Sequence, residues 1–174
     1  MTSIRERMEE GADHTAARTP FQAGRAAKMT GKRPKMRMAQ GRIEIATMGR
    51  GFYEVTTQAA AWVAEQGVET GLLTLFICHT SASLLIQENA APEVRTDLID
   101  FLAGLAPEDP SRWRHDDEGG DDMPAHARAA VLPVQLSVPV AGGRLLLGIW
   151  QGIYVIEHRR RAHRREIILH LTGA

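Results

Sequence analysis

The chain has 174 residues, carries 21 basic and 21 acidic side chains, and contains a single cysteine. This length suffices for one domain with a real core plus an extension, and a lone Cys78 excludes an intramolecular disulfide and a cysteine-rich zinc site. No segment approaches the roughly 20 apolar residues that a membrane-spanning helix needs. The N-terminus also lacks the apolar core of a signal peptide, so we expect a cytoplasmic protein without a membrane partner.

The charge is unevenly distributed along the chain. Residues 1–40 hold nine basic and four acidic side chains, whereas residues 41–174 hold 12 basic and 17 acidic ones. The first 40 residues have no sustained apolar face, which predicts a flexible basic extension (1–40) before a domain (41–174). A basic arm can bind a polyanion, but we favour a solvated extension and do not expect nucleic acid as a partner. All three lysines lie in this extension, which excludes a Schiff-base or Walker-type lysine in the domain.

Hydrophobic periodicity predicts the elements of the domain in order. Strands are expected at 42–47 with a continuation over 52–57, then at 72–78, 134–140, 145–150, 151–157 and 164–171. Helices are expected at 58–66, 92–105 and 125–131. Thr57 should cap the first helix, Gly67 should end it, and Pro92 should lie in the first turn of the second. This order predicts an α+β fold with a mostly antiparallel, sandwich-like sheet and two main helices.

A buried strand followed by polar side chains is the most informative stretch of the domain. The apolar run 72–78 is typical of a strand buried on both faces. It is followed by a polar group that includes His79, Ser81, Ser83, Glu88 and Asn89. Buried polar groups require partners, so we expect other protein groups, a metal or a substrate at this point.

Three of the seven histidines are candidates for a site. His79, His115 and His126 lie at the ends of predicted elements or in the long acidic segment 108–124, where sites are commonly built. Three neutral imidazoles from separate segments can form an open site for zinc or a similar ion. The alternative is that each is hydrogen-bonded locally. By contrast, His158, His163 and the three arginines 159–161 between them predict an exposed basic turn.

Acidic and amide side chains supply the other candidates. Candidate general acids or bases, or ligands of a hard cation, are Glu88, Asp97, Asp116, Asp121 and Asp122, although any of them could be a surface acid. Trp150 and Gln151 offer N–H donors suited to a polar ligand. The equally weighted alternative is a Trp in the core and a Gln that satisfies a backbone group.

Three motifs occur in order and carry a family resemblance. They are His79-Thr80-Ser81-Ala82-Ser83 with Glu88-Asn89-Ala90, then His115 with Asp121-Asp122-Met123-Pro124-Ala125-His126, and then Val138-Pro139-Val140 with Gly143, Leu147-Gly148 and Trp150-Gln151, followed by Glu157 and Arg164. From about Gly41 to the C-terminus the chain resembles the YjbQ family, the secondary thiamine-phosphate synthase enzymes. Ile149 and Gln135 stand where that family usually has Thr and Ser.

The resemblance implies a homotrimer with a polar, metal-binding pocket for a small-molecule substrate. It implies zinc or magnesium bound near His79, His115 and His126. The implied catalytic residues are His79, Glu88, Asp97 and Asp122. The implied substrate-binding residues are Ser81, Ser83, Asn89, Trp150, Gln151 and Arg164.

The activity implied by the resemblance joins hydroxymethylpyrimidine diphosphate to thiazole phosphate and releases diphosphate. The domain is net acidic and has no lysine and no Gly-rich phosphate loop, so we expect this transferase activity to be weak. Two alternatives remain open. One is a metal-dependent hydrolase or lyase that acts on a small substrate, and the other is a non-catalytic trimeric protein that binds a small ligand.

Overall fold

The structure is a computed structural model that describes residues 35–174. Its first strand, β1 (Arg37–Thr47), begins before the predicted start of the domain at residue 41, so residues 37–40 are part of the sheet. Residues 1–34 of the predicted extension lie outside the described residues. None of the described helices is long and apolar enough to cross a membrane.

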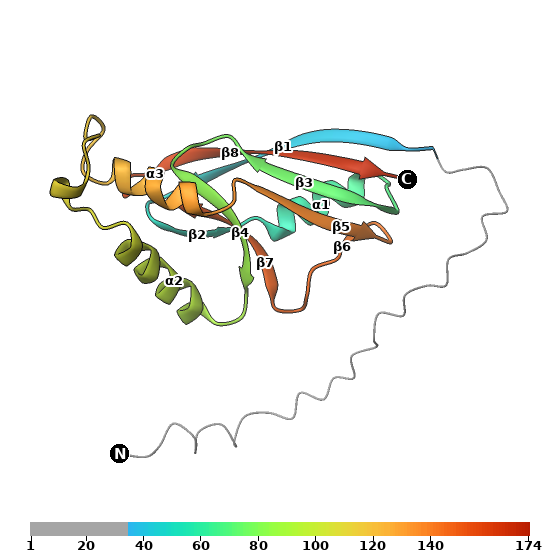
Figure 1. Cartoon of the computed structure of the whole chain (residues 1–174). Helices are drawn as coiled ribbons and strands as arrows, with labels where there is room; N and C mark the ends of the chain where they lie inside the picture. Colours follow the sequence, from blue (N-terminus) through green and yellow to red (C-terminus); the bar gives the residue numbers. More distant parts are fainter. Residues whose placement is uncertain (1–34) are drawn as a thin grey trace, which may run out of the picture. The chain divides into compact units, whose positions relative to one another are not determined.

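The larger of the two sheets has five strands, and each neighbouring pair is antiparallel (Figure 1). Its order is β1, β8 (His163–Gly173), β3 (Thr70–Ile77), β5 (Gln135–Ala141) and β6 (Arg144–Leu145). Along β8 every second residue from Arg165 to Gly173 is buried and the residues between them are half-buried. This alternation confirms the period of two expected for a strand with one face in the core.

The smaller sheet has three strands and packs against the inner face of the larger one. Its order is β2 (Gly51–Glu54), β7 (Gln151–Glu157) and β4 (Ala82–Glu88), again antiparallel. Leu84 of β4 and Val155 of β7 belong to the same buried cluster as Leu75 and Leu169 of the larger sheet. The α+β class with mostly antiparallel sheets is therefore confirmed.

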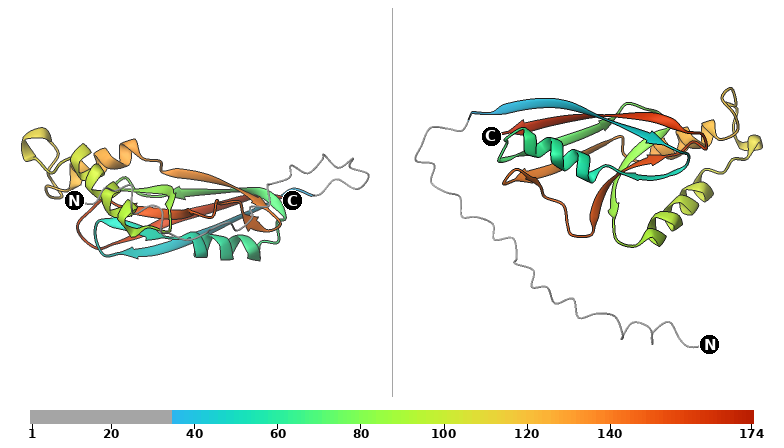
Figure 2. Two further views of the ribbon diagram at one scale, coloured as in Figure 1. Left: turned by 90° about the horizontal axis from the view of Figure 1, so that it is seen from below. Right: turned by 180° about the vertical axis from the view of Figure 1, so that it is seen from behind.

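Helix α1 (Thr56–Glu65) completes the core, and the other helices lie at one end of the sheets. Ala59 and Val63 of α1 are buried in the core, and Figure 2 shows this helix lying against the sheet. Helix α2 (Pro92–Leu105), the short 3₁₀ turn Pro110–Arg112 and helix α3 (Asp122–Val131) follow one another at the end opposite the C-terminus (Figure 1).

A buried arginine connects α3 to the end of α2. Arg128 donates through Nε to the carbonyl oxygen of Leu102 (3.0 Å) and through Nη2 to that of Ala106 (2.6 Å). The last carbonyls of a helix lack partners within the helix. Arg128 supplies the donor for the Ala106 carbonyl and a second donor for that of Leu102, which also accepts the Ala106 N–H (3.2 Å), and these contacts fix the start of the loop that leads to α3.

Several boundaries differ from those predicted. Helix α1 begins at Thr56 and has no side-chain cap, so Thr57 is not its N-cap, although Gly67 has the expected positive φ of 62°. Helix α3 begins three residues before 125 because Asp122 and Met123 precede Pro124 in its first turn. The predicted strand 145–150 is wrong beyond Leu145.

Two strand assignments are corrected in the region of the polar group. Residues 82–88 form the strand β4, which polar side chains at 79–83 and 87–89 obscured in the sequence. Strand β3 is buried on one face only, because Leu72 and Phe76 are exposed, and Cys78 directly after the strand is exposed as well. The outer face of the larger sheet therefore presents apolar side chains to solvent.

Two glycines that face each other across β3 and β8 give a prediction for stability. Gly71 pairs with Gly173, and a Cβ added to Gly71 would lie 2.4 Å from the carbonyl oxygen of Thr172. We expect Gly71→Ala to lower the free energy of unfolding by about 1–3 kcal/mol, because the backbone must move to accept the methyl group. Urea denaturation measures this change.

The matched control is Gly104→Ala in α2. An added Cβ at Gly104 meets nothing within 4 Å, and the residue is helical. Alanine is preferred over glycine inside helices by about 0.5–1 kcal/mol, so this variant should be slightly more stable than the wild type. Equal stability of the two variants would contradict the tight approach of β3 to β8.

Candidate metal centre

Three side chains converge where the acidic loop meets α3. His115, Asp122 and His126 each offer a ligand atom, and these atoms lie within 4.8 Å of one another. Asp122 is the first residue of α3 and is only 2% exposed, and His126 follows one helical turn later on the same face. The loop brings His115 to them. Because α3 begins at residue 122, Asp122 and His126 lie one turn apart on the same helix. The predicted helix began at residue 125 and so did not show this spacing.

A backbone carbonyl fixes the orientation of the His126 imidazole. Its Nδ1 lies 3.0 Å from the carbonyl oxygen of Thr80, which can only accept a hydrogen bond, so Nδ1 donates. The other ring nitrogen, Nε2, faces Asp122 Oδ1 at 3.6 Å. A second nitrogen that donates to a carbonyl is the usual support of a metal-binding histidine.

One oxygen of Asp122 has no hydrogen-bond donor. Oδ2 is buried without a partner, although His115 Nε2 lies only 2.9 Å away, because that contact lacks hydrogen-bond geometry. A buried carboxylate oxygen without a donor is costly, and such groups are uncommon in native proteins. An imidazole nitrogen and a carboxylate oxygen this close together share a cation, which is either a proton on the imidazole or a metal ion between the two atoms. The donor set of two imidazoles and one carboxylate fits zinc or a similar divalent ion with a position left for a ligand.

A buried guanidinium holds Asp122 from the opposite side. Arg159 is 2% exposed and donates through Nη1 to Asp122 Oδ1, through Nε to Asp121 Oδ2 (3.2 Å) and through Nη2 to the carbonyl oxygen of Glu118 (2.9 Å). Burial alone would raise the pKa of Asp121, but the backbone N–H of Arg160 and the guanidinium of Arg159 outweigh it and lower the pKa. Asp121 therefore stays ionised.

The buried position of Arg159 corrects the prediction of an exposed basic turn. His158 and Arg159 continue the buried run of β7 into the core, and only Arg160 and Arg161 are exposed as expected. Nothing in the sequence distinguishes the buried Arg159 from the exposed Arg160 and Arg161. The only hint is that they follow directly on a fully buried strand.

The buried His158 makes stability depend on pH. Its Nε2 lies 2.9 Å from Ser83 Oγ, and burial, assisted by the Arg128 guanidinium, lowers its pKa from 6.5 to about 3. Below pH 6.5 the unfolded chain therefore takes up a proton that the folded chain does not. The contribution of neutral His158 is complete above pH 6.5 and is lost as the pH falls.

Because His158 stays neutral in the folded protein, we expect the free energy of unfolding to fall by about 2 kcal/mol between pH 6.5 and pH 5. His158→Gln cannot titrate, so its stability should fall less than that of the wild type over this range, whatever its value at neutral pH. Urea denaturation at pH 7, 6 and 5, in the presence of a chelator, measures the two slopes. Parallel pH profiles would contradict this assignment.

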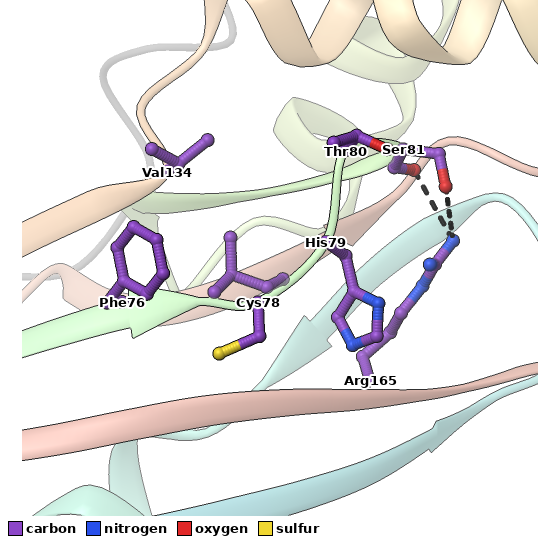
Figure 3. A pocket seen from close by; sticks show the side chains of 8 residues that line it. Phe76, Cys78, His79, Thr80, Ser81, Val134 and Arg165 are labelled. Carbon is purple, nitrogen blue, oxygen red and sulfur yellow. Dashed lines mark hydrogen bonds between the residues drawn. The ribbon is translucent and has the colours of Figure 1, made fainter.

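His79 does not belong to the His115–Asp122–His126 group found among the described residues, so its role as a metal ligand stays a prediction. Its Nε2 accepts the backbone N–H of Glu166 (2.8 Å), so its lone pair is already used. Burial, followed by the charge of Arg165, lowers the pKa of His79 and favours a neutral ring. With Ser81 and Arg165 it lines a cavity of about 580 Å³, shown in Figure 3. The adjacent Thr80 carbonyl links this cavity to His126.

The cationic side chain of this cavity is neutralised by a buried carboxylate. Arg165 donates through Nε and Nη2 to the two oxygens of Glu157 (2.7 and 2.6 Å), and its Nη2 also reaches Ser81 Oγ (3.1 Å; Figure 3). Burial would raise the pKa of Glu157, but the bonds from Arg165, the Arg159 backbone N–H and the Thr47 hydroxyl lower it. Arg165 is thus a paired residue rather than a free anion-binding group.

Other predicted site residues lie at the far end of the smaller sheet. Glu88 pairs with Gln151, whereas Ala82 pairs with Glu157 at the end nearer the histidines. Six residues of strand span about 20 Å at 3.3 Å per residue. The structure therefore does not bring Glu88 and Gln151 to the candidate metal centre within one chain.

The amides at this far end hold a turn together. Asn89 Nδ2 donates to the carbonyl oxygens of Ile149 and Gln151 (3.4 Å each), and Gly148 N donates to Gln151 Oε1 (2.7 Å). The Trp150 side chain is 55% exposed and is not in the core. The substrate-binding roles expected for Asn89 and Gln151 thus have structural alternatives.

The last three predicted residues also lie apart from the centre. Ser83 is buried against His158. Asp97 is exposed on α2, outside the metal group of the described residues. The Arg164 side chain is 86% exposed and lies 3.9 Å from Glu44. Of the predicted residues, the centre retains His115, Asp122 and His126, and sequence reasoning missed the role of Arg159.

Two antiparallel sheets that carry a His–Asp–His group at one end define an α+β protein with a candidate metal centre. A family model described as UPF0047 protein YjbQ-like matches residues 41–174, and the chain belongs to this family. The chain is 50% identical to UPF0047 protein sll1880 of Synechocystis over 137 residues, which cover 79% of this chain and 93% of the relative. It is 44% identical to YjbQ of Salmonella typhimurium over 135 residues, covering 77% and 97%.

Solved structures share the fold. A conserved hypothetical protein from Thermus thermophilus matches with a TM-score of 0.66 and 35% identity, covering 74% of this chain and 97% of that one. A YbjQ-like protein of unknown function from Sulfolobus solfataricus matches with a TM-score of 0.75 and 23% identity, covering 80% and 100%. The family resemblance seen in the motifs is confirmed.

Proposed function

We propose that this protein is a metal-dependent enzyme, a hydrolase or lyase, that acts on a small molecule. The observation that carries the proposal is the buried Oδ2 of Asp122, which lacks a donor and lies beside two imidazoles. Two nitrogen ligands favour zinc or a similar transition metal over magnesium, which prefers oxygen ligands. Such an ion would supply Lewis acidity to a polar group of the substrate.

The residues around the centre support a reaction at its open side. The His115 side chain is 45% exposed, so a small molecule can approach from solvent. Thr80 and Arg159 fix His126 and Asp122 from behind, which preorganises both groups. Of the carboxylates predicted as general acids, bases or ligands, Asp122 is at the centre and Glu88 is not. Asp122 is thus our candidate carboxylate ligand of the ion, with Oδ2 as its ligand atom.

The thiamine-phosphate synthase activity implied by the resemblance is the second candidate. In its favour, the cavity beside His79 has about 580 Å³, a volume suited to small substrates. Against it, the nearby guanidinium groups of Arg159 and Arg165 are already paired with carboxylates, which leaves little to hold a diphosphate. We therefore rank this transferase behind the hydrolase or lyase and expect weak turnover.

The proposal includes a homotrimer in the cytoplasm. Leu72 and Phe76 on the outer face of the larger sheet are 44% and 45% exposed, which supports self-association through this face. Light scattering coupled to size-exclusion chromatography measures the assembly directly. A monomeric mass for the wild type would remove this part of the proposal and leave the metal centre untouched.

Turnover measurements test the proposal and separate its alternatives. The purified full chain is assayed with small phosphate esters and amides, and with the two thiamine precursors, before and after chelation. We expect hydrolysis or elimination that chelation abolishes, that zinc restores and that His115→Ala removes. His170→Ala, at a distant position on β8, is the matched control.

Each other outcome favours a different function. Thiamine phosphate formation that collapses in His79→Ala would support the transferase. Tight ligand binding without turnover would identify a non-catalytic binding protein. Turnover unchanged by His79→Ala, His115→Ala and His126→Ala would contradict both enzyme proposals.

A further inference from the structure

A second cavity opens directly beside the metal centre. It has a volume of about 270 Å³ and is lined by Pro110, Trp113, His115, Asp116 and Gly120. His115 belongs to both the cavity and the group of candidate metal ligands. A molecule in this cavity therefore lies against one of the residues that would hold the ion.

The indole of Trp113 is fixed in place. Its Nε1 donates to the carbonyl oxygen of Pro107 (2.8 Å), and the guanidinium carbon of Arg112 lies 5.8 Å from its ring centroid. The 3₁₀ turn that precedes it is capped by Asp109, which accepts the backbone N–H of Ser111 (2.9 Å). An aromatic side chain that is half-exposed yet held at its polar end offers a preorganised apolar surface.

The lining of the cavity determines what it can accept. Pro110 and Trp113 form an apolar part suited to a flat ring, whereas His115 marks the end towards the ion. The volume lies below the usual range of about 300–1,000 Å³ for drug-sized ligands, so it suits one ring rather than two. Asp116 in the lining disfavours a negatively charged ring.

We propose that this cavity is a substrate subsite for a single uncharged or cationic aromatic ring that packs on Trp113. The polar substituent of the ring points past His115 to the ion. This inference rests on the metal centre of the proposed function and specifies its substrate class, an aromatic or heteroaromatic compound with one metal-binding group.

Two hydroxamates test the subsite because they share a metal-binding group and differ only in the ring. Benzohydroxamate and acetohydroxamate are titrated into the zinc-loaded full-length protein, and calorimetry gives both dissociation constants. We expect benzohydroxamate to bind about tenfold more tightly, which corresponds to the stacking and burial of one ring. Quenching of tryptophan fluorescence by benzohydroxamate provides a second readout.

Variants locate the ring. Trp113→Ala should bring the two dissociation constants within about threefold, with acetohydroxamate binding unchanged, and Trp113→Phe should retain most of the preference. Phe101→Ala is the matched control, because Phe101 is 63% exposed on α2 and does not line the cavity. It should keep the full preference. A carboxylate at the 4-position of benzohydroxamate should weaken binding, and Asp116→Asn should reduce that loss.

The outcomes distinguish failure of the subsite from failure of the centre. If neither hydroxamate binds the wild type more tightly than Asp122→Ala, the proposed metal centre is wrong. If both bind the wild type equally, or if Trp113→Ala keeps the preference for the ring, the subsite is wrong and the centre stands. Loss of the preference in Phe101→Ala would place the ring on α2 instead of on Trp113, and the subsite would be wrong.

Discussion

Replacing His115 by alanine is expected to weaken zinc binding by about 100-fold or more, because residues that merely support a ligand already contribute 10–100-fold. His115 is one of three residues whose ligand atoms lie within 4.8 Å of one another. Its side chain is 45% exposed, so its removal should change the stability of the metal-free protein little. A competition titration against a chromogenic chelator gives the affinity, and urea denaturation gives the stability.

His79→Ala is the informative control for this prediction. The family resemblance predicts His79 as a metal ligand. In the structure, His79 Nε2 instead accepts a hydrogen bond from the backbone N–H of Glu166. Zinc affinity should therefore remain within a few-fold of the wild type. An equal loss in His79→Ala and His115→Ala would restore the ligand set expected from the motifs. Zinc that stays bound in His115→Ala would contradict the centre itself.

The parts of the fold that the sequence predicts well are those governed by local pattern. β8 alternates with a period of two, and α2 begins with Pro92 and has its apolar residues at helical spacing, so both were located to within about two residues. β4 was missed because its apolar centre at 84–86 lies between polar side chains that suggested a site. In the structure Ser83 is simply a buried strand residue that is satisfied by His158.

The residues of the candidate site could likewise be predicted only in part. His115 and His126 could be selected because histidines beside an acidic loop are chemically unusual, and the structure brings them together with Asp122. Asn89 and Gln151 carry equally suggestive side chains, but the antiparallel pairing of β4 with β7 places them at the far end of the sheet. Such separation depends on strand register, which no local pattern in the sequence determines.

The burial of Arg159 is the feature of the site that the sequence reveals least. It leads to the second prediction with a large expected effect. We expect Arg159→Gln to lower the free energy of unfolding by about 3–5 kcal/mol, because it leaves Asp121 and Asp122 buried without their cation. Both carboxylates accept hydrogen bonds from this guanidinium. Urea denaturation of the chelator-treated protein at pH 7 measures the effect without interference from a bound metal.

Arg160→Gln is the matched control, since it makes the same chemical change one residue further on. The Arg160 side chain is 69% exposed and pairs with Glu108. Exposed ion pairs contribute at most about 1 kcal/mol, so this variant should remain close to the wild type. If the two variants were equally stable, the buried network around Asp122 would not exist as described. Because the two arginines are neighbours in sequence and identical in chemistry, any difference between them must come from the end of β7, which carries Arg159 into the core beside the candidate metal centre.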